Sequence, residues 1–289
     1  MRSKKIGQKG RRIISNTIIY VILVLISIIW VFPFFYLIIQ SLRIDNPGLS
    51  LTLFPEDWQY GLDNYIKLFT DSAYNFGRWY LNTLIIAVLT TIFQTILVLM
   101  TAYALSRLRF KGRKGLMKFM LIIGMFPGFL GMICIYKILQ AVGLQTSIFG
   151  LFLVYIAGSA MNYYISKGFF DTIPRSLDEA ALIDGANRNT VFWRIIIPLS
   201  KPIVVYTVLT AFLAPWGDFM MANYLVGRGS QEAFTVAVGL QKWIQPTLSG
   251  VYFTRFCAGG VFVSIPIVIL FFWLQRYYVE GVTGGAVKG

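Results

Sequence analysis

Side chains that could do covalent or acid–base chemistry are scarce in this chain. It has no His, the usual general base and metal ligand near neutral pH. Its two cysteines, Cys134 and Cys257, stand in or beside apolar stretches without C-x-x-C spacing, so we expect packing residues, and nothing favours a disulfide. The sequence has no G-x-x-x-x-G-K-[ST] segment to form a phosphate-binding loop. We therefore expect no catalytic residue, no metal site and no bound cofactor.

One short polar stretch offers binding chemistry instead. Ser176 and Glu179 have the S-x-x-E spacing of a capping box, which predicts the start of a helix. Gly185 suits the left-handed residue that ends such a helix. A second short helix is predicted from about Thr190, with Pro198 stopping it. Small residues and carboxylates here would let the surface of a partner approach closely. An ordinary amphipathic re-entry loop is the alternative, and composition leaves the two comparable.

A few polar groups within the apolar stretches are candidates for a translocation path. Asp218 is the only acid deep in such a stretch, where an ionisable residue is a functional candidate by default. Aromatic faces beside a carboxylate or amide are a common way to hold sugars. The candidates are Asp218, Trp216, Asn162 and Tyr163. Hydrogen bonding between helices is the alternative role for them.

The composition places these residues in a membrane protein. The 289-residue chain is 57% hydrophobic and 13% charged, whereas soluble domains are about half apolar and about a quarter charged. About 20 apolar residues in a helix cross the hydrocarbon layer, and six segments are long enough. They are residues 14–41, 81–106, 114–139, 145–168, 202–227 and 256–277. Gly and Pro interrupt the third and fourth, so neighbouring helices or a cavity must satisfy the freed backbone groups. We expect an all-α integral membrane protein with six transmembrane helices.

The basic residues indicate the orientation of these segments. With the N-terminus inside, 19 of the 26 lysines and arginines fall in cytoplasmic segments and seven outside. This asymmetry predicts that both termini are cytoplasmic, and it accounts for the net charge of +14 without nucleic acid. The first apolar run, residues 13–42, is too long for a signal-peptide core of about 7–15 residues. We expect a multi-pass protein of the cell membrane with a retained first helix.

The polar stretch as a whole resembles a known element. Its pattern E-A-A-x-x-D-G-A-x(5)-F-x-x-I-x-x-P is similar to the cytoplasmic coupling loop of permease subunits of ATP-binding-cassette (ABC) importers. The matching residues are Glu179, Ala180, Ala181, Asp184, Gly185, Ala186, Phe192 and Pro198. One minor departure is Ile197, where the family often has Leu. The resemblance implies a type I ABC importer permease fold and a non-catalytic subunit. Its partners would be a second homologous permease, two ABC ATPase subunits and an extracytoplasmic sugar-binding protein.

Three further stretches resemble the smaller permease of maltose and maltodextrin transporters: residues 63–69, 227–240 and 275–289. In relatives, a loop like the second enters the sugar cleft of the binding protein, and a tail like the third reaches between the ATPase subunits. The residues implied are Gly229, Ser230 and Gln231 in the loop, and Gly284, Gly285, Lys288 and Gly289 in the tail. A solvated loop and a disordered end are the alternatives. In the maltose relatives the larger permease holds the sugar, which favours a structural role for Asp218 and its companions.

The domain organisation expected is one membrane domain in three parts. Residues 1–80 hold the first span and an outer loop, 81–277 form the core with a coupling loop at 169–201, and 278–289 form a cytoplasmic tail. In the outer loop, the spacing of Leu62, Tyr65, Ile66 and Phe69 predicts a short helix on the membrane surface.

Other classes of membrane protein fit this sequence less well. A secondary transporter would show inverted repeats and broken helices around buried charges. A membrane enzyme would need an acid–base pair or metal cluster, and a channel would need a selectivity element. No repeat is visible and buried charge is nearly absent, and the sequence shows no credible acid–base pair, metal cluster or selectivity element. The function expected is ATP-driven import of an oligosaccharide, with maltose or maltodextrin as the first choice. Another oligosaccharide carried by this family is the alternative, and a secondary transporter is the alternative from a different class.

Overall fold

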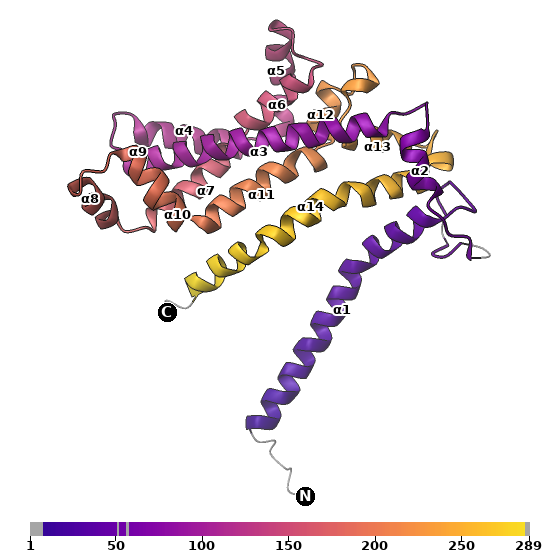
Figure 1. Cartoon of the computed structure of the whole chain (residues 1–289), viewed down its shortest axis with the longest axis horizontal. Coiled ribbons are helices and arrows are strands. Elements are labelled where there is room, and N and C mark those ends of the chain that lie inside the picture. The colour runs from indigo at the N-terminus through magenta and orange to yellow at the C-terminus, as the bar shows by residue number, and fades with distance from the viewer. Residues whose placement is uncertain (1–7, 51, 56–57, 287–289) are drawn as a thin grey trace, which may run out of the picture. The chain divides into compact units, whose positions relative to one another are not determined.

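The computed structural model describes residues 8–50, 52–55 and 58–286. They form helices (Figure 1), and the only β-pairing within these ranges is one isolated bridge between Arg43 and Tyr60. Four helices are long and apolar enough to cross a membrane: Arg12–Leu42, Phe76–Arg107, Ile148–Asp171 and Ser249–Tyr277. Two bent pairs qualify if each counts as one span: Arg113–Met125 with Leu130–Ala141, and Arg188–Leu199 with Lys201–Gly217. Each of the six predicted segments falls on one of these four to six candidates.

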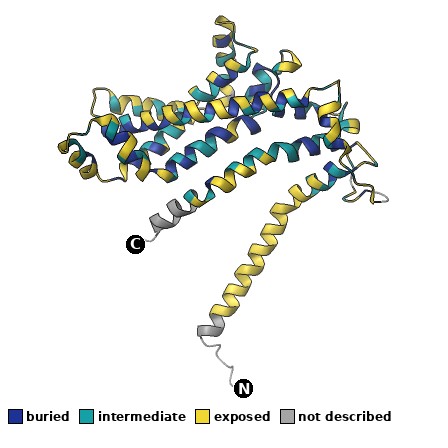
Figure 2. Ribbon diagram, in the orientation of Figure 1, coloured by how far each residue is buried: buried dark blue, intermediate teal, exposed yellow. Residues whose placement is uncertain are grey.

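The chain divides into two compact units, residues 1–68 with 244–261 and residues 69–243 with 262–289. In the first unit, α1 (Gln8–Leu42) leaves its apolar spanning stretch exposed, as Figure 2 shows. Polar contacts gather at its C-terminal end, where Gln40 Nε2 donates to the Thr52 carbonyl at 3.0 Å. Asn64 Nδ2 donates to the carbonyls of Ser41 and Arg43 at 3.0 and 2.7 Å. These bonds fix the segment that follows α1.

The short helix predicted in the outer loop is present as α2 (Asp63–Thr70). Part of its predicted apolar side packs on the protein, since the Phe69 ring meets the Phe76 ring edge-on with centres 5.6 Å apart. Leu62 and Ile66 are exposed, whereas Asn64 and Leu68 are buried. The buried amide is satisfied by the hydrogen bonds just described and by one from Thr254 Oγ1 to Asn64 Oδ1 at 3.0 Å.

In the second unit, α3 (Phe76–Arg107) is the central helix. It packs against α6 (Ile148–Ala157), α7 (Ala160–Asp171) and α11 (Lys201–Gly217), and Figure 1 shows α3 and α11 side by side. The predicted interruptions are real. The axes of α4 (Arg113–Met125) and α5 (Gly128–Ala141) differ by 107° on either side of Pro127. At the break between α6 and α7, Gln94 Nε2 donates to Ser159 Oγ at 2.6 Å, so a buried polar pair supports it.

The C-terminal part of the chain holds α12 (Met220–Leu225), α13 (Val236–Trp243) and α14 (Ser249–Ala286). Helix α14 begins before the predicted last span and continues past residue 277. Residues 278–286, expected to form a separate tail, therefore extend that helix. The division of the chain at residues 80 and 277 stays a prediction.

Candidate functional site

The predicted polar stretch begins as the short helix α8 (Arg175–Ile183), which ends at a left-handed glycine. Gly185 has φ of +84°. Its N–H donates to the Leu182 carbonyl at 3.2 Å, and the Ala186 N–H donates to the Ala181 carbonyl at 2.9 Å. This is the Schellman arrangement that favours glycine after a helix. The turn predicted at Gly185 is confirmed. A side chain there would meet no atom within 4 Å, so glycine is required by the backbone conformation and not by space.

The predicted start of this helix is wrong by two residues, because the residue before the helix is Pro174 and not Ser176. The helix begins at Arg175, with Pro174 as the flanking residue and no side-chain cap, so Ser176 lies inside the first turn. Pro174 has the fixed φ of its ring, −57°, with an extended ψ of 132°, and the chain enters the helix directly after it. The capping box does not form.

The predicted end of the second helix is also wrong. Asn187 caps α9 (Arg188–Val191), its Oδ1 accepting the Thr190 N–H at 2.8 Å. A π-helical turn, η2 (Phe192–Ile196), follows, and Pro198 lies inside α10 (Ile197–Leu199).

The π-helical turn explains why Pro198 does not stop the helix. The Ile197 N–H reaches five residues back to the Phe192 carbonyl, so the register has already shifted where proline lacks its donor. The chain instead breaks at Ser200. The segments on either side, Arg188–Leu199 and Lys201–Gly217, form a bend of 86°. Pro202 occupies the first turn of α11, as predicted.

The inner side of this loop is held in an apolar core. Phe192 is 4% exposed, and its ring lies 5.0 Å from that of Tyr103 on α3. Ala181, Leu182 and Ala186 pack against the same cluster. The buried members of the cluster are Leu99, Ala102, Tyr103, Phe170, Ile173, Val191, Phe192, Ile196 and Ile203. The loop is therefore packed onto α3, α7 and the start of α11.

A buried ion pair ties α8 to the C-terminal end of α3, and the sequence did not reveal it. Arg107 Nε lies 3.0 Å from Asp178 Oδ2, with the two side chains 2% and 8% exposed. Arg107 Nη2 also donates to the Ile173 carbonyl at 2.8 Å. A second contact runs from Arg175 Nη2 to the Ser106 carbonyl at 3.2 Å. The cation is at a helix C-terminus and the anion in the first turn of a helix, which is where each helix dipole favours them.

The outer side of α8 is exposed. Glu179, Ala180 and Asp184 all face solvent, and Figure 2 shows this end of the second unit largely exposed. Ile183 is 86% exposed, an apolar side chain with little contact in the chain itself. This exposed side can form a binding face. It offers the carboxylates of Glu179 and Asp184, the small side chain of Ala180 and the exposed side chain of Ile183. Ile183 was missed because its position matches neither a cap nor the resemblance pattern.

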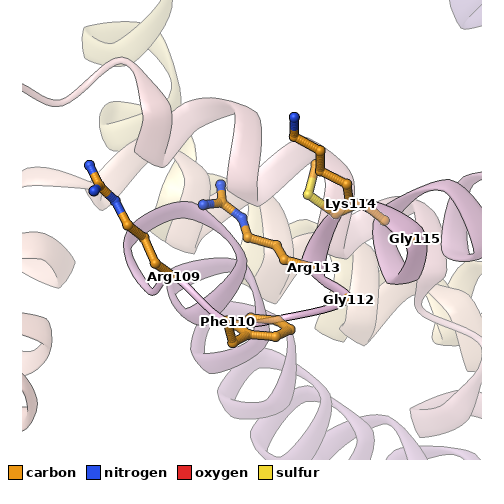
Figure 3. Close-up of a pocket in the computed structure, with 7 residues that line it drawn as sticks. Arg109, Phe110, Gly112, Arg113, Lys114 and Gly115 are labelled. Carbon is orange, nitrogen blue, oxygen red and sulfur yellow. The ribbon is translucent and has the colours of Figure 1, made fainter.

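Beside this face, the turn between α3 and α4 is strongly basic. Arg109, Arg113 and Lys114 line a pocket of about 540 Å³, and Figure 3 shows the three side chains extending to one side while Phe110 turns the other way. A second pocket of about 580 Å³ lies between this turn and α8, and Arg109 and Glu179 are among its lining residues. Of the coupling-loop candidates, Glu179 thus borders this basic turn.

The outer-loop candidates lie between α12 and α13. Gly229 is partly buried, and its N–H donates to the Val226 carbonyl at 3.0 Å. Ser230 and Gln231 are exposed. Gln231 opens the 3₁₀ turn η3 (Gln231–Ala233). After the turn, Lys242 Nζ lies 3.9 Å from the centre of the Phe234 ring, and burial lowers the pKa of Lys242 below its ordinary value. The loop has an exposed tip on a buried base.

The four translocation candidates do not come together as one site. Asp218 Oδ2 accepts the Tyr155 hydroxyl at 2.9 Å, and its Oδ1 accepts the Met221 N–H at 3.0 Å, so the carboxylate joins α6 to the start of α12. Trp216 is 5% exposed and packs edge-on against Tyr80.

Asn162 and Tyr163 lie half-buried on α7, and no hydrogen bond within the described ranges links either to Asp218. The contacts of Asp218 and Trp216 are those of residues that hydrogen-bond and pack between helices.

The tail candidates are only partly covered by the structure. Gly284 and Gly285 lie in the last turn of α14. Lys288 and Gly289 lie outside the described residues.

Three comparisons with known proteins bear on this geometry. A family profile described as "binding-protein-dependent transport system inner membrane component" matches residues 97–284. The maltodextrin transport system permease protein MalD of Streptococcus pneumoniae is 37% identical, covering 97% of this chain and 98% of that protein. The galactooligosaccharides transport system permease protein GanQ of Bacillus subtilis is 35% identical, with 97% and 98% covered.

A solved structure has the same fold. It is a bacterial ABC transporter involved in the import of the acidic polysaccharide alginate, and one chain matches with a TM-score of 0.77 at 23% identity. The match covers 96% of this chain and 100% of that one. A second structure, of a bacterial alginate ABC transporter with a periplasmic protein bound to alginate pentasaccharide, matches with a TM-score of 0.62 at 18% identity.

Proposed function

Because the chain belongs to the family of binding-protein-dependent transport system inner membrane components, we propose that it is a permease subunit of an ABC importer for an oligosaccharide. The chain is a multi-pass membrane protein of that family. The observation that supports the finer assignment is the exposed face of α8, packed against α3 by a buried ion pair and an apolar core. A face of this kind can transmit a force from a partner without unfolding.

In this mechanism the chain itself does no ATP chemistry. One of two ATPase subunits binds the face around Glu179, Ile183 and Gly185, and closure of the two ATPases on ATP displaces α8. The displacement passes through Asp178 and Arg107 into α3, and through the apolar core into α7 and α11. The spans then reorient against those of a second, homologous permease. In this arrangement α8 and both termini lie on the cytoplasmic side, in line with the excess of basic residues there.

The cargo proposed is a maltodextrin delivered by an extracytoplasmic binding protein. Support comes from the maltodextrin permeases of Streptococcus pneumoniae and Bacillus subtilis, each 37% identical over almost the whole chain. A galactooligosaccharide is the second candidate, because GanQ is 35% identical over a similar length. The loop at Gly229, Ser230 and Gln231 faces the binding protein, and the end of the chain from Gly284 to Gly289 reaches the ATPases.

The assembly is tested by purifying the tagged chain from its own cells in mild detergent and identifying its partners by mass spectrometry. Gly185→Val forces a branched side chain into a left-handed conformation that costs about 1–2 kcal/mol. It is expected to reduce the recovery of a P-loop ATPase without loss of the chain. Gly168→Val is the matched control, because Gly168 lies on α7 in open space without positive φ. A chain recovered without any ATPase, or one unaffected by Gly185→Val, contradicts the coupling role.

The cargo is tested with the complex in liposomes. Maltodextrins and galactooligosaccharides are each supplied with the binding protein that carries them, and ATP hydrolysis and sugar uptake are measured. Stimulation by the maltodextrin-loaded protein alone supports the first candidate. Stimulation only by the galactooligosaccharide-loaded protein replaces it with the second, and uptake without ATP would reject the importer assignment.

A further inference from the structure

The backbone leading from the loop of residues 228–232 into α13 is held by polar side chains of α3. Trp79 Nε1 donates to the Gln231 carbonyl at 2.9 Å. Asn82 Nδ2 donates to the carbonyls of Glu232 and Phe234 at 2.6 and 3.0 Å. Three side-chain donor bonds therefore reach one stretch of four residues, from a helix about 150 positions earlier in the chain.

A fourth bond completes the attachment at the start of α13. Thr83 Oγ1 accepts the Val236 N–H at 2.8 Å and donates to the Trp79 carbonyl at 3.0 Å. The hydroxyl thus satisfies one of the first N–H groups of α13, which have no partner within their own helix. The beginning of α13 is capped by a residue of another helix.

These attachment residues are buried while the loop they hold is exposed. Trp79 and Thr83 are 0% exposed and Asn82 is 3% exposed. By contrast, the side chains of Ser230 and Gln231 face solvent. Burying polar groups is unfavourable unless each finds a partner, and here the partners are backbone atoms of one loop. Packing alone would need no such donors.

The close fit of Trp79 strengthens this attachment. Its six-membered ring lies directly against the backbone of Gly239 in α13, where an added Cβ would collide with it. Trp79 also packs against Phe234, with ring centres 6.2 Å apart. The loop base therefore has one position on α3, fixed by shape as well as by hydrogen bonds.

We infer that Trp79, Asn82 and Thr83 are positioning residues that preset the loop of residues 228–232 for the sugar-loaded binding protein. The inference rests on the proposed function and extends it from the loop tip to the helix that holds it. A loop ordered before binding loses less conformational entropy when the partner arrives, so it binds more tightly. Releasing the base leaves the tip residues intact but lets them sample other positions.

The test uses the full complex in nanodiscs with four variants of α3. Thr83→Val removes the acceptor at nearly constant shape, and Asn82→Leu removes the donors. Thr83→Ser keeps the hydroxyl and serves as the conservative rescue. Thr91→Val is the matched control, because the Thr91 hydroxyl donates only within its own helix, to the Ala87 carbonyl.

Amide hydrogen exchange of residues 231–238 is the first readout. Loss of one buried hydrogen bond, worth about 1 kcal/mol, corresponds to an exchange rate raised about fivefold. We expect that rise for Thr83→Val and Asn82→Leu, and none for Thr83→Ser or Thr91→Val. Unchanged exchange in Thr83→Val overturns the inference, even if Asn82→Leu fails to assemble.

The second readout is ATP hydrolysis against the concentration of sugar-loaded binding protein. We expect the half-saturating concentration to rise about fivefold in Thr83→Val, with the maximal rate within about twofold of the wild type. A lower maximal rate at unchanged half-saturation would overturn the positioning role. If no binding protein stimulates the wild-type complex, the proposed function fails, whereas the exchange result still decides whether α3 holds the loop.

Discussion

Replacing Asp178 by Asn tests the buried ion pair between α8 and α3. At a separation of 3.0 Å and an effective dielectric constant of about 20, the attraction between unit charges is about 5–6 kcal/mol. Desolvation of both groups offsets much of this attraction in the intact pair. Removing the Asp178 charge alone is different, because Arg107 then stays buried without its counter-charge. Breaking a buried pair in this way lowers the stability by about 3–5 kcal/mol. We expect Asp178→Asn to lower the stability by about 3 kcal/mol.

The companion variant, Arg107→Gln, should be somewhat worse. It also removes the hydrogen bond from Arg107 to the Ile173 carbonyl, worth roughly 1 kcal/mol more. In the double variant neither charge stays buried without its partner. The stability that the double variant loses should therefore be about 2 kcal/mol smaller than the sum of the losses in the two single variants. This shortfall isolates the interaction between the two side chains.

The assay is thermal unfolding of the purified complex in detergent, together with basal and sugar-stimulated ATP hydrolysis. With roughly 2 °C per kcal/mol, the Tm of Asp178→Asn should fall by about 6 °C. Stimulated hydrolysis should fall more than basal hydrolysis, because α8 loses its charged link to α3. Lys167→Gln is the control, since its partner Asp171 is 39% exposed and such a pair contributes less than about 1 kcal/mol.

Two results would refute this reasoning. Additive losses in the double variant would show that the two charges do not interact in the folded protein. An unchanged ratio of stimulated to basal hydrolysis in Asp178→Asn would show that the link carries no force from α8.

Three further predictions concern other parts of the chain. Gly239→Ala should destabilise the complex by about 1–3 kcal/mol through overpacking against Trp79, measured as a lower Tm; an unchanged Tm would show that the indole can move aside. Asp218→Asn should destabilise the protein, because an amide nitrogen cannot accept the bonds the carboxylate accepts; a weaker apparent affinity for sugar at full stability would place Asp218 on the translocation path. Deletion of residues Gly284–Gly289 should impair assembly or ATP turnover, and unchanged turnover would leave the tail without that role.

Local sequence determined several features of this protein directly. Apolar runs of membrane-spanning length located the segments that hold the four to six candidate spans, because a helix needs about 20 apolar residues to cross the hydrocarbon layer. Gly185 was identified as the end of α8, because few other residues adopt a left-handed conformation at little cost. The pattern around it also indicated the family, which the profile match over residues 97–284 confirms.

Local patterns failed where two competing local signals met. The spacing of Ser176 and Glu179 fits a capping box, yet Pro174 sets the start of α8 two residues earlier. Pro198 is a strong stop signal, yet the π-helical turn before it shifts the hydrogen-bond register and accommodates the missing N–H. Phe192, which opens this turn, packs into the apolar core, a contact that no sequence window shows.

Only the tertiary structure decided which distant residues meet. Arg107 and Asp178 stand 71 positions apart, and nothing in the spacing of either marks it as a partner of the other. The same holds for Asn82 and Glu232, which are hydrogen-bonded although they stand 150 positions apart in the sequence. Helical periodicity tells which side of a helix is apolar, but the choice of neighbour depends on how all the helices pack together. That packing gives α8 its charged link to α3 and gives the outer loop its fixed base.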